Sequence, residues 1–407
     1  MRNNGIITAL FVIVLSLISF QSFSQTVPAD TILANKYFDL ARQNETAGRF
    51  DTAVFYAKEA QVLNTGYFGE KSIKNANSLN LLGWILWDKG EYDPALENDF
   101  KALEIRKEIL GEKHLDLAAS YYNIGLVYGD KGEFDKSLEY LDRALQLRKE
   151  LLGEKHAETA TAYYIMGIVY MNKGDYDNAL KYQLNALHTR RENFGEKNLD
   201  VAAIENNLGV IYWYKGEYDL ALEYDLKVLQ TRIDLLGENN IDVAAGYDNT
   251  GLAYWKKGEY DKALEYNLKA LQIKKEILGE KSLDVAGSYL NTGNVYYNKG
   301  EYDKVLEYYL QALQIYREIL GEKHTAVAQS YNNIGVICWN KGDYDQALEY
   351  HFKALKIRKE VLGEKHTDVA SSYNNIGLVY WNKGDYDQAL ENYSRALAID
   401  KEALGEK

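Results

Sequence analysis

A single internal period constrains what this chain can fold into. The string Gly-Glu-Lys, or a close variant of it, begins at Gly69, returns at Gly111 and keeps this interval, without insertion, up to Gly405. A second glycine series with the same period runs from Gly48 to Gly384 and divides each unit into two equal halves. Such self-similarity is the signature of a chain built from stacked structural repeats. The sequence therefore predicts nine tandem repeats, each with two helices of about 16–19 residues.

The residues around the second glycine series favour helices on both sides of it. From Gly90 onward each of these glycines follows a lysine. A cation in the last turn complements the helix dipole, and glycine takes the left-handed conformation that ends a helix. Acidic residues follow, such as Asp343 and Asp345, and they suit a helix N-terminus. Because no segment alternates as a strand would, we predict an all-α fold.

The N-terminus has the form of a secretory signal. Arg2 gives a positive start, residues 6–20 form an apolar run, and Ser22 and Ser24 place small residues at the cleavage positions. We predict a signal peptide over residues 1–24, a short linker over residues 25–33 and repeats over residues 34–407. The mature chain would then act in a bacterial periplasm, at a cell surface or outside the cell. The apolar run is shorter than the ~20 residues that span a bilayer, which favours a cleaved signal. An uncleaved N-terminal anchor is the alternative.

Charge and motif content exclude several classes of function. The net charge is −13 and the lysines lie among glutamates, so neither nucleic acid nor an anionic membrane surface is an expected partner after signal cleavage. No phosphate-binding loop or nucleophile motif is present, and the carboxylates repeat with the units as solvated faces do. We therefore predict no enzyme activity and no cofactor. Four histidines share one turn position but belong to different repeats, too far apart for a shared metal site: His114, His156, His324 and His366.

Aligned on their glycines, the repeats share a motif in the first helix. It reads Tyr-x-x-Ile-Gly-x-x-Tyr at residues 121–128 and again at residues 373–380. Small residues such as Ala347 and Ala354 follow on the second helix, where they let two backbones approach. This pattern resembles the tetratricopeptide repeat family, and the length of the period resembles that of its kinesin light chain subtype. Over residues 34–407 the resemblance implies a right-handed α-solenoid of nine repeats, of which the first, with Ala41 for the glycine, is a degenerate cap.

The repeats also depart from the family pattern. Four positions after the first small residue of the second helix, the family places a bulky side chain, which is Tyr309 here but Asn267 and His351 in other repeats. The following position is apolar, as at Leu268, so we expect packing between repeats to differ in detail. The only cysteine, Cys338, replaces a motif tyrosine, and we predict that it is a small buried apolar residue.

The resemblance further implies that the first helices line a concave groove. With the central glycine counted as position eight, positions five, nine and twelve share one stripe, distinct from the packing stripe at four, eight and eleven. Five of the six tryptophans fall at position twelve, and amides recur at position five. We predict that this groove binds a protein or an extended peptide through Trp87, Tyr122, Tyr164, Asn206, Trp213, Trp255, Tyr297, Asn332, Trp339, Asn374 and Trp381.

Several readings of this stripe stay open. An exposed aromatic stripe is unfavourable unless something binds it, and amides suit an extended backbone, but the tryptophans are equally explained by packing between first helices. In amide pairs such as Asn374-Asn375, which resemble those of light-chain repeats, we expect the second asparagine to bond between repeats. No clamp for a terminal carboxylate is expected, since the stripe carries no lysine or arginine and position nine is an asparagine only at Asn294. Glycan capture on the tryptophans and a sensory role in a longer signalling protein are the alternative functions.

Overall fold

The computed structural model describes residues 29–404 as helices joined by short turns. These residues form eighteen helices and contain no strand, which confirms the predicted all-α fold. The predicted signal peptide over residues 1–24 lies outside the described residues. Among the helices that are described, none is long and apolar enough to cross a membrane.

Each repeat contributes a first and a second helix. The first helices are α1 (Ala29–Thr46), α3 (Ile73–Lys89), α5 (Leu115–Asp130), α7 (Ala157–Lys173), α9 (Leu199–Tyr214), α11 (Ile241–Lys256), α13 (Leu283–Lys299), α15 (Thr325–Asn340) and α17 (Thr367–Lys383). The second helices are α2 (Phe50–Phe68), α4 (Tyr92–Leu110), α6 (Phe134–Leu152), α8 (Tyr176–Phe194), α10 (Tyr218–Leu236), α12 (Tyr260–Leu278), α14 (Tyr302–Leu320), α16 (Tyr344–Leu362) and α18 (Tyr386–Leu404).

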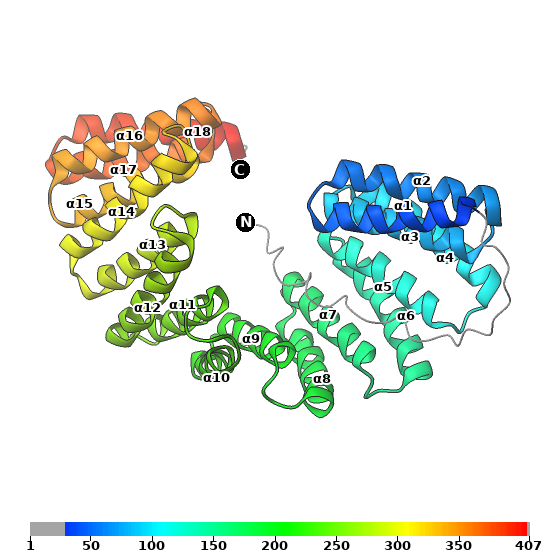
Figure 1. Cartoon of the computed structure of the whole chain (residues 1–407). Coiled ribbons are helices and arrows are strands. Elements are labelled where there is room, and N and C mark those ends of the chain that lie inside the picture. The colour runs from blue at the N-terminus through cyan, green and yellow to red at the C-terminus, as the bar shows by residue number, and fades with distance from the viewer. Residues whose placement is uncertain (1–28, 405–407) are drawn as a thin grey trace. The chain divides into compact units, whose positions relative to one another are not determined.

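The chain forms two compact units. Unit one holds α1 to α5, and unit two holds α6 to α18. Within unit two, the two helices of a repeat pack on each other, and each second helix packs on the first helix of the next repeat (Figure 1). Unit one follows the same rule from α1 to α5. This neighbour-to-neighbour packing confirms the predicted α-solenoid of nine repeats. Helix α1 begins at Ala29, with Asp30 in its first turn, so residues 29–33 of the expected linker are helical.

The turns depend on glycine as the sequence indicated. After α13, Gly300 has φ 75° and ψ 11°, and its N–H donates to the carbonyl oxygens of Tyr296 and Tyr297. Both glycine series keep a positive φ from Gly48 to Gly384. A side chain would be strained in this conformation, so the turns from Gly48 to Gly384 require their glycines.

The central glycine of the first helix marks the closest approach within a repeat. A Cβ added at Gly293 would lie 2.7 Å from Cε1 of Tyr309 on α14. In other repeats the side chain over the glycine is polar, yet Asn267 and His351 are as buried as Tyr309. The apolar residue that follows does not replace it in the core, since Leu268 is 39% exposed. The departure from the family pattern therefore changes the chemistry of this contact, while the contact stays at the same place in the fold.

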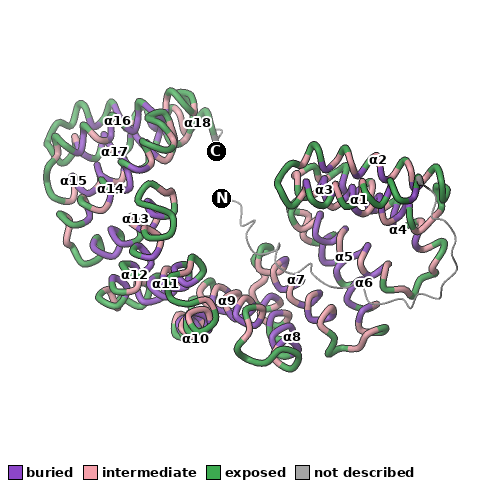
Figure 2. The backbone as a smooth tube through the Cα atoms, viewed as in Figure 1, coloured by how far each residue is buried: buried purple, intermediate pink, exposed green. Residues whose placement is uncertain are grey.

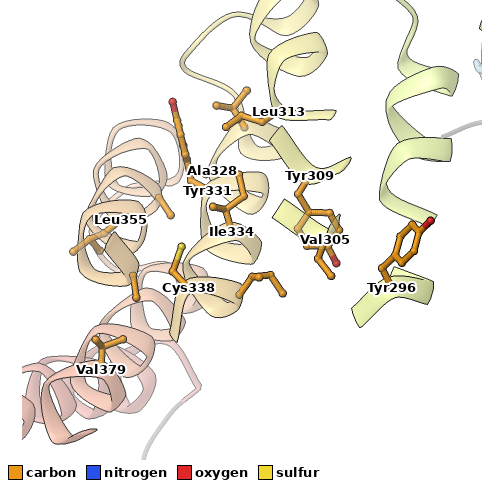
Figure 3. Packing of buried hydrophobic residues seen from close by; sticks show 14 of the residues in the cluster. Tyr296, Val305, Tyr309, Leu313, Ala328, Tyr331, Ile334, Cys338, Leu355 and Val379 are labelled. Atoms are coloured by element: carbon orange, nitrogen blue, oxygen red, sulfur yellow. The ribbon is translucent and has the colours of Figure 1, made fainter. Parts of the chain in front are cut away.

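The apolar core of unit two consists of one large cluster between the helices of successive repeats, from α10 to α18, and of smaller clusters. In unit two, Figure 3 shows Tyr331, Ile334 and Cys338 of α15 beside Leu355 of α16 and Val379 of α17. Buried positions follow the helix faces that meet, and the turns are exposed (Figure 2). Cys338 is 1% exposed, which confirms the prediction of a small buried residue, and burial raises the pKa of its thiol.

A buried basic side chain on the second helix ties three helices together. From α16, Arg358 Nη1 donates to Ser372 Oγ at 2.8 Å and to the carbonyl oxygen of Asp368 on α17, and Nη2 donates to Gln329 Oε1 on α15 at 2.7 Å. Burial of a cation is tolerated only when its donors find acceptors, so these bonds fix how successive repeats meet. The same position makes equivalent bonds in other repeats through Arg106, Arg190 and Lys274.

Two glycines of α13 provide a matched test of this packing. Gly293→Ala should destabilise α13 and α14 by about 1–3 kcal/mol, because the new methyl group would overlap the ring of Tyr309. Gly287→Ala, where nothing lies within 4 Å of the added Cβ, should instead stabilise α13 by up to ~1 kcal/mol. Hydrogen exchange in the two helices measures both effects. Equal responses to the two substitutions would show that Gly293 does not mark a close approach.

The buried histidine over Gly335 should make stability depend on pH. Burial, reinforced by the charge of Arg358, lowers the pKa of His351 to about 4. Histidine in an unfolded chain titrates near ~6.5, so the unfolded chain takes up the proton first as the pH falls. The stabilisation is thus fully present above about pH 6.5 and is lost towards pH 4, by about 3 kcal/mol.

His351→Asn, which introduces the residue found at position 267, removes this titration. Chemical unfolding at several pH values should show a smaller loss of stability on acidification for the variant than for the parent chain. The same pH dependence in both would contradict a neutral buried histidine.

Candidate binding face

The residues predicted to bind a ligand lie along the first helices. We call positions five, nine and twelve of α3 to α17 the first-helix stripe; unit one holds those of α3 and α5, and unit two holds those of α7 to α17. In α17, Leu378 and Trp381 of the stripe are exposed, whereas Ile376 and Val379 beside them are buried. In α17 the stripe is therefore an accessible face next to the face that packs, whereas in other first helices some of its residues, such as Leu126 and Asn332, are buried.

The tryptophans of the stripe in unit two are only partly accessible. Trp381 in the last repeat is 56% exposed, and its ring centroid lies 4.9 Å from that of Tyr386. Trp213, Trp255 and Trp339 are half buried, and their indole nitrogens are fully buried without a hydrogen-bond partner in the described residues. Trp213, Trp255 and Trp339 therefore pack within the fold and present only part of each ring to solvent.

Trp87 in unit one and the tyrosines of the stripe are also only partly exposed. Trp87 is half buried and donates from Nε1 to Asp130 Oδ2 at 2.9 Å. Tyr122 is half buried as well, and Tyr297 in unit two is 39% exposed. Packing between first helices, the alternative reading of the stripe, thus accounts for the buried surface of each of these rings.

A lysine beside the stripe covers two of the tryptophans. Nζ of Lys256, at position thirteen of α11, lies 4.6 Å from the ring centroid of Trp255 and 5.5 Å from that of Trp213. A cation over an indole face is attracted by the ring quadrupole. One face of each ring is therefore occupied before any ligand arrives. Sequence reasoning missed this contact because it considered only the stripe positions themselves.

Hydrogen bonds between successive first helices form rungs in unit two. Asn249 Nδ2 donates to Asn206 Oδ1 at 3.2 Å, and Asn375 Nδ2 donates to Asn332 Oδ1 at 2.8 Å. In each rung, position six of one repeat bonds to position five of the repeat before it. The expectation that the second asparagine bonds between repeats is thus confirmed at Asn375.

The rungs decide what the amides of the stripe offer to a ligand. The side-chain oxygens of Asn206 and Asn332 accept hydrogen bonds within the fold, which leaves their NH2 groups as donors. Asn332 is 9% exposed, whereas Asn374 in the last repeat is exposed. Tyr164 holds position five in α7, where burial raises the pKa of its hydroxyl, and Asn207 Nδ2 at position six of α9 is buried without a hydrogen-bond partner in the described residues. The amides are therefore held in fixed orientations by the repeats themselves.

The repeated histidines serve the turns, as predicted. Nδ1 of His114 accepts the backbone N–H of Asp116 at 3.1 Å, and His366 caps α17 in the same way through Asp368. These side chains do the work of the serine and asparagine caps in other repeats. Within residues 29–404 no group of three or more His, Cys, Asp or Glu side chains is arranged to hold a metal ion.

Comparison with known proteins identifies the architecture. A family model described as tetratricopeptide repeat matches residues 100–150, 116–170, 158–232, 200–276, 284–351 and 327–402, and a second model with this description matches residues 75–116. No curated protein sequence matches the chain.

Solved structures with the same helical architecture include proteins of different kinds. The apo form of RapI is similar with 19% identity and a TM-score of 0.63, over 92% of this chain and 99% of that protein. A STAND signal transduction ATPase with a tetratricopeptide repeat sensor from Pyrococcus horikoshii has 16% identity and a TM-score of 0.62, over 93% of this chain and 54% of that protein. Repeats of a putative kinesin light chain from Podosopora anserina have 16% identity and a TM-score of 0.46, over 52% of this chain and 99% of that protein. At these identities the likeness concerns the fold alone.

Two adjacent asparagines separate structure from recognition. Asn375→Ala breaks the rung to Asn332 and leaves a buried oxygen unpaired, so it should lower the free energy of unfolding by about 1–2 kcal/mol. Asn374→Ala alters an exposed side chain and should stay within ~0.5 kcal/mol of the parent. Thermal unfolding followed by circular dichroism compares them. A larger loss for Asn374→Ala would mean that the roles of the pair are reversed.

Proposed function

The chain belongs to the tetratricopeptide repeat family, and from this premise we propose that it is a non-enzymatic scaffold whose first-helix stripe binds an extended segment of a partner protein. The proposal includes the concave groove and the peptide ligand that the sequence predicted. Export from the cytoplasm is part of the proposal as well. It rests on the signal-like sequence of residues 1–24, which lie outside the described residues.

The fixed amides of the stripe carry this proposal. Asn206 and Asn332 are held by rungs to the next repeat and keep donors for a ligand. An extended chain offers one carbonyl oxygen per residue, so donors that recur along successive helices suit it. Exposed apolar residues of the stripe, Leu252, Leu378 and Trp381, lie on the same helix faces and supply area for hydrophobic contact. Binding to such a preformed face avoids the cost of ordering it.

Glycan binding, the alternative from another class, has less support. Sugars stack on accessible faces of aromatic rings. Lys256 covers one face of Trp213 and of Trp255, and both rings are half buried. A ladder of free indole faces is therefore not what unit two presents. The polar and apolar mixture of the stripe fits a polypeptide better.

Three exposed residues test the proposal without removing a packed tryptophan. The variant Leu252→Ser, Leu378→Ser and Trp381→Ser should lose affinity for peptides that the parent chain selects from a displayed library of random peptides. A length of about 12 residues, roughly 40 Å when extended, crosses several helices. Each anchor that is a hot spot contributes ~2 kcal/mol, so the loss of two such anchors should already weaken binding about 1000-fold.

The control changes leucines of similar exposure on second helices. Leu184→Ser, Leu268→Ser and Leu310→Ser alter residues that are 41%, 39% and 43% exposed, and binding should change by less than ~3-fold. Normal binding by the stripe variant would refute the proposal. A chain that selects no peptide, but whose tryptophan fluorescence responds to soluble oligosaccharides, is a glycan-binding protein instead.

A further inference from the structure

The two ends of the repeat array present packing faces that nothing covers in the described residues. At an inner step, a second helix packs on the first helix of the next repeat. Among residues 29–404, α18 has no first helix after it and α1 has no second helix before it. Helix α1 belongs to unit one and α18 to unit two. Each unit therefore carries one face that lacks the helix on which its equivalents pack.

The end face of α18 exposes two leucines. Leu390 is 68% exposed and Leu397 is 57% exposed, whereas their equivalents in α16, Leu348 and Leu355, are 8% and 7% exposed. The two leucines of α18 are seven residues apart and so share one face of the helix. An exposed apolar face of this kind is unfavourable in water and marks an interaction surface.

The end face of α1 combines an exposed apolar residue with a cation. Leu33 is 37% exposed, although Val369, its equivalent in α17, is fully buried. Lys36 is exposed as well, whereas Ser372 at the same place in α17 is fully buried. A spacing of three residues puts Leu33 and Lys36 on one face of α1. This face is thus the counterpart of one that is covered at an inner step.

The charges on the two end faces are complementary. Asp400 of α18 holds the place of Arg358 in α16, and Lys36 of α1 holds the place of Ser372 in α17. At the inner step these two places are bonded, since Arg358 Nη1 donates to Ser372 Oγ at 2.8 Å. The same two places are bonded between α4 and α5 and between α12 and α13. At the ends of the array, an acid and a base therefore occupy the places of a bonded pair.

The acid and the base are both available to a second chain. Neither Asp400 nor Lys36 has a hydrogen-bond or ion-pair partner among residues 29–404. When α18 of one copy packs on α1 of another as α16 packs on α17, the carboxylate and the ammonium group come to lie opposite each other. Opposite charges at matching places give the contact its direction, because neither face carries the complement of its own charge at that place.

We propose that copies of this chain bind end to end, with α18 of one copy packed on α1 of the next. The contact repeats the stacking of an inner step, with an ion pair between Asp400 and Lys36 and with Leu390, Leu397 and Leu33 covered. Because the two faces differ, each added copy leaves one face of each kind open, so association proceeds beyond a dimer. This inference needs no ligand on the first-helix stripe and is independent of the peptide-binding function.

Sedimentation velocity of the full chain over a range of concentrations tests the contact. The parent chain should form species larger than a dimer as its concentration rises, with the weak affinity of a small interface. Lys36→Asp alone and Asp400→Lys alone each place like charges at the contact, and each should weaken association about 10-fold or more. All variants carry the same residues 1–28, so differences between them report on the end faces.

A mixture of the two charge variants separates this contact from a folding defect. Every contact between unlike chains in the mixture again joins opposite charges, so association should return to within ~3-fold of the parent. Poor folding of either variant would not produce this recovery. Lys58→Asp, which reverses the charge of an exposed lysine of α2, should leave association unchanged.

The apolar part of the contact has its own variants. Leu390→Ser combined with Leu397→Ser should weaken association about 100-fold or more, because two leucines are no longer removed from water. Leu268→Ser combined with Leu310→Ser changes exposed leucines of other second helices and should leave association as in the parent.

Three results would overturn the proposal. One is a parent chain that stays monomeric up to its solubility limit. Another is association that the charge variants and the leucine variant all retain, since surfaces other than the end faces would then carry it. The third is association that stops at a dimer and does not respond to Lys36→Asp, which would mean that two α18 faces pair with each other. Selection of peptides by the first-helix stripe is a separate measurement, so either proposal can fail alone.

Discussion

At several steps, successive repeats are held in register by a buried basic side chain that must satisfy acceptors on two other helices at once, whereas α14 carries Tyr316 at this position. Contacts between alanine, valine and leucine are not directional, so apolar packing alone would tolerate a slip of one helix along the next. Arg358 does not tolerate it, because a slip would strand its guanidinium donors in the core. Arg106 in unit one bonds to its neighbours in the same manner. At these steps the positions of residues on the accessible faces follow from this register.

The binding face inherits its order from that register. The rungs from Asn249 and Asn375 form because position six of one first helix comes to lie beside position five of the helix before it. Where the base is Lys274, its ammonium group holds Asp248, and a small pocket between α11 and α13, lined in part by Asp248 and Asn291, lies where other steps have a rung. A change in a residue of the core thus alters the chemistry of the surface one helix away. The repeats share a backbone, and their individual steps differ in what they offer a ligand.

Sequence periodicity predicted the helices, the glycine turns and the stripe, because these features depend on local conformation and on spacing within one helix. It also predicted the structural role of Asn375 and the burial of Cys338. The buried basic side chain of the second helix was not predicted, since Arg358 lies in a run of charged residues that looks like a solvated face. The half-burial of Trp213 also depends on the neighbouring repeat, in particular on Lys256 of α11. Contacts between one repeat and the next are set by tertiary packing, which a pattern within one helix does not contain.

The bonds of the buried basic side chain to two neighbouring helices affect how such a chain can change during evolution. An insertion or deletion of one residue within a helix would rotate the basic side chain by about 100° and separate it from acceptors on both neighbours. Duplication or loss of a whole repeat, by contrast, regenerates every acceptor at the new junction. Selection against misfolded variants would therefore remove small length changes and permit whole-repeat ones. The unbroken spacing of the glycines from Gly48 to Gly384 is the record expected of a gene that grew in this way.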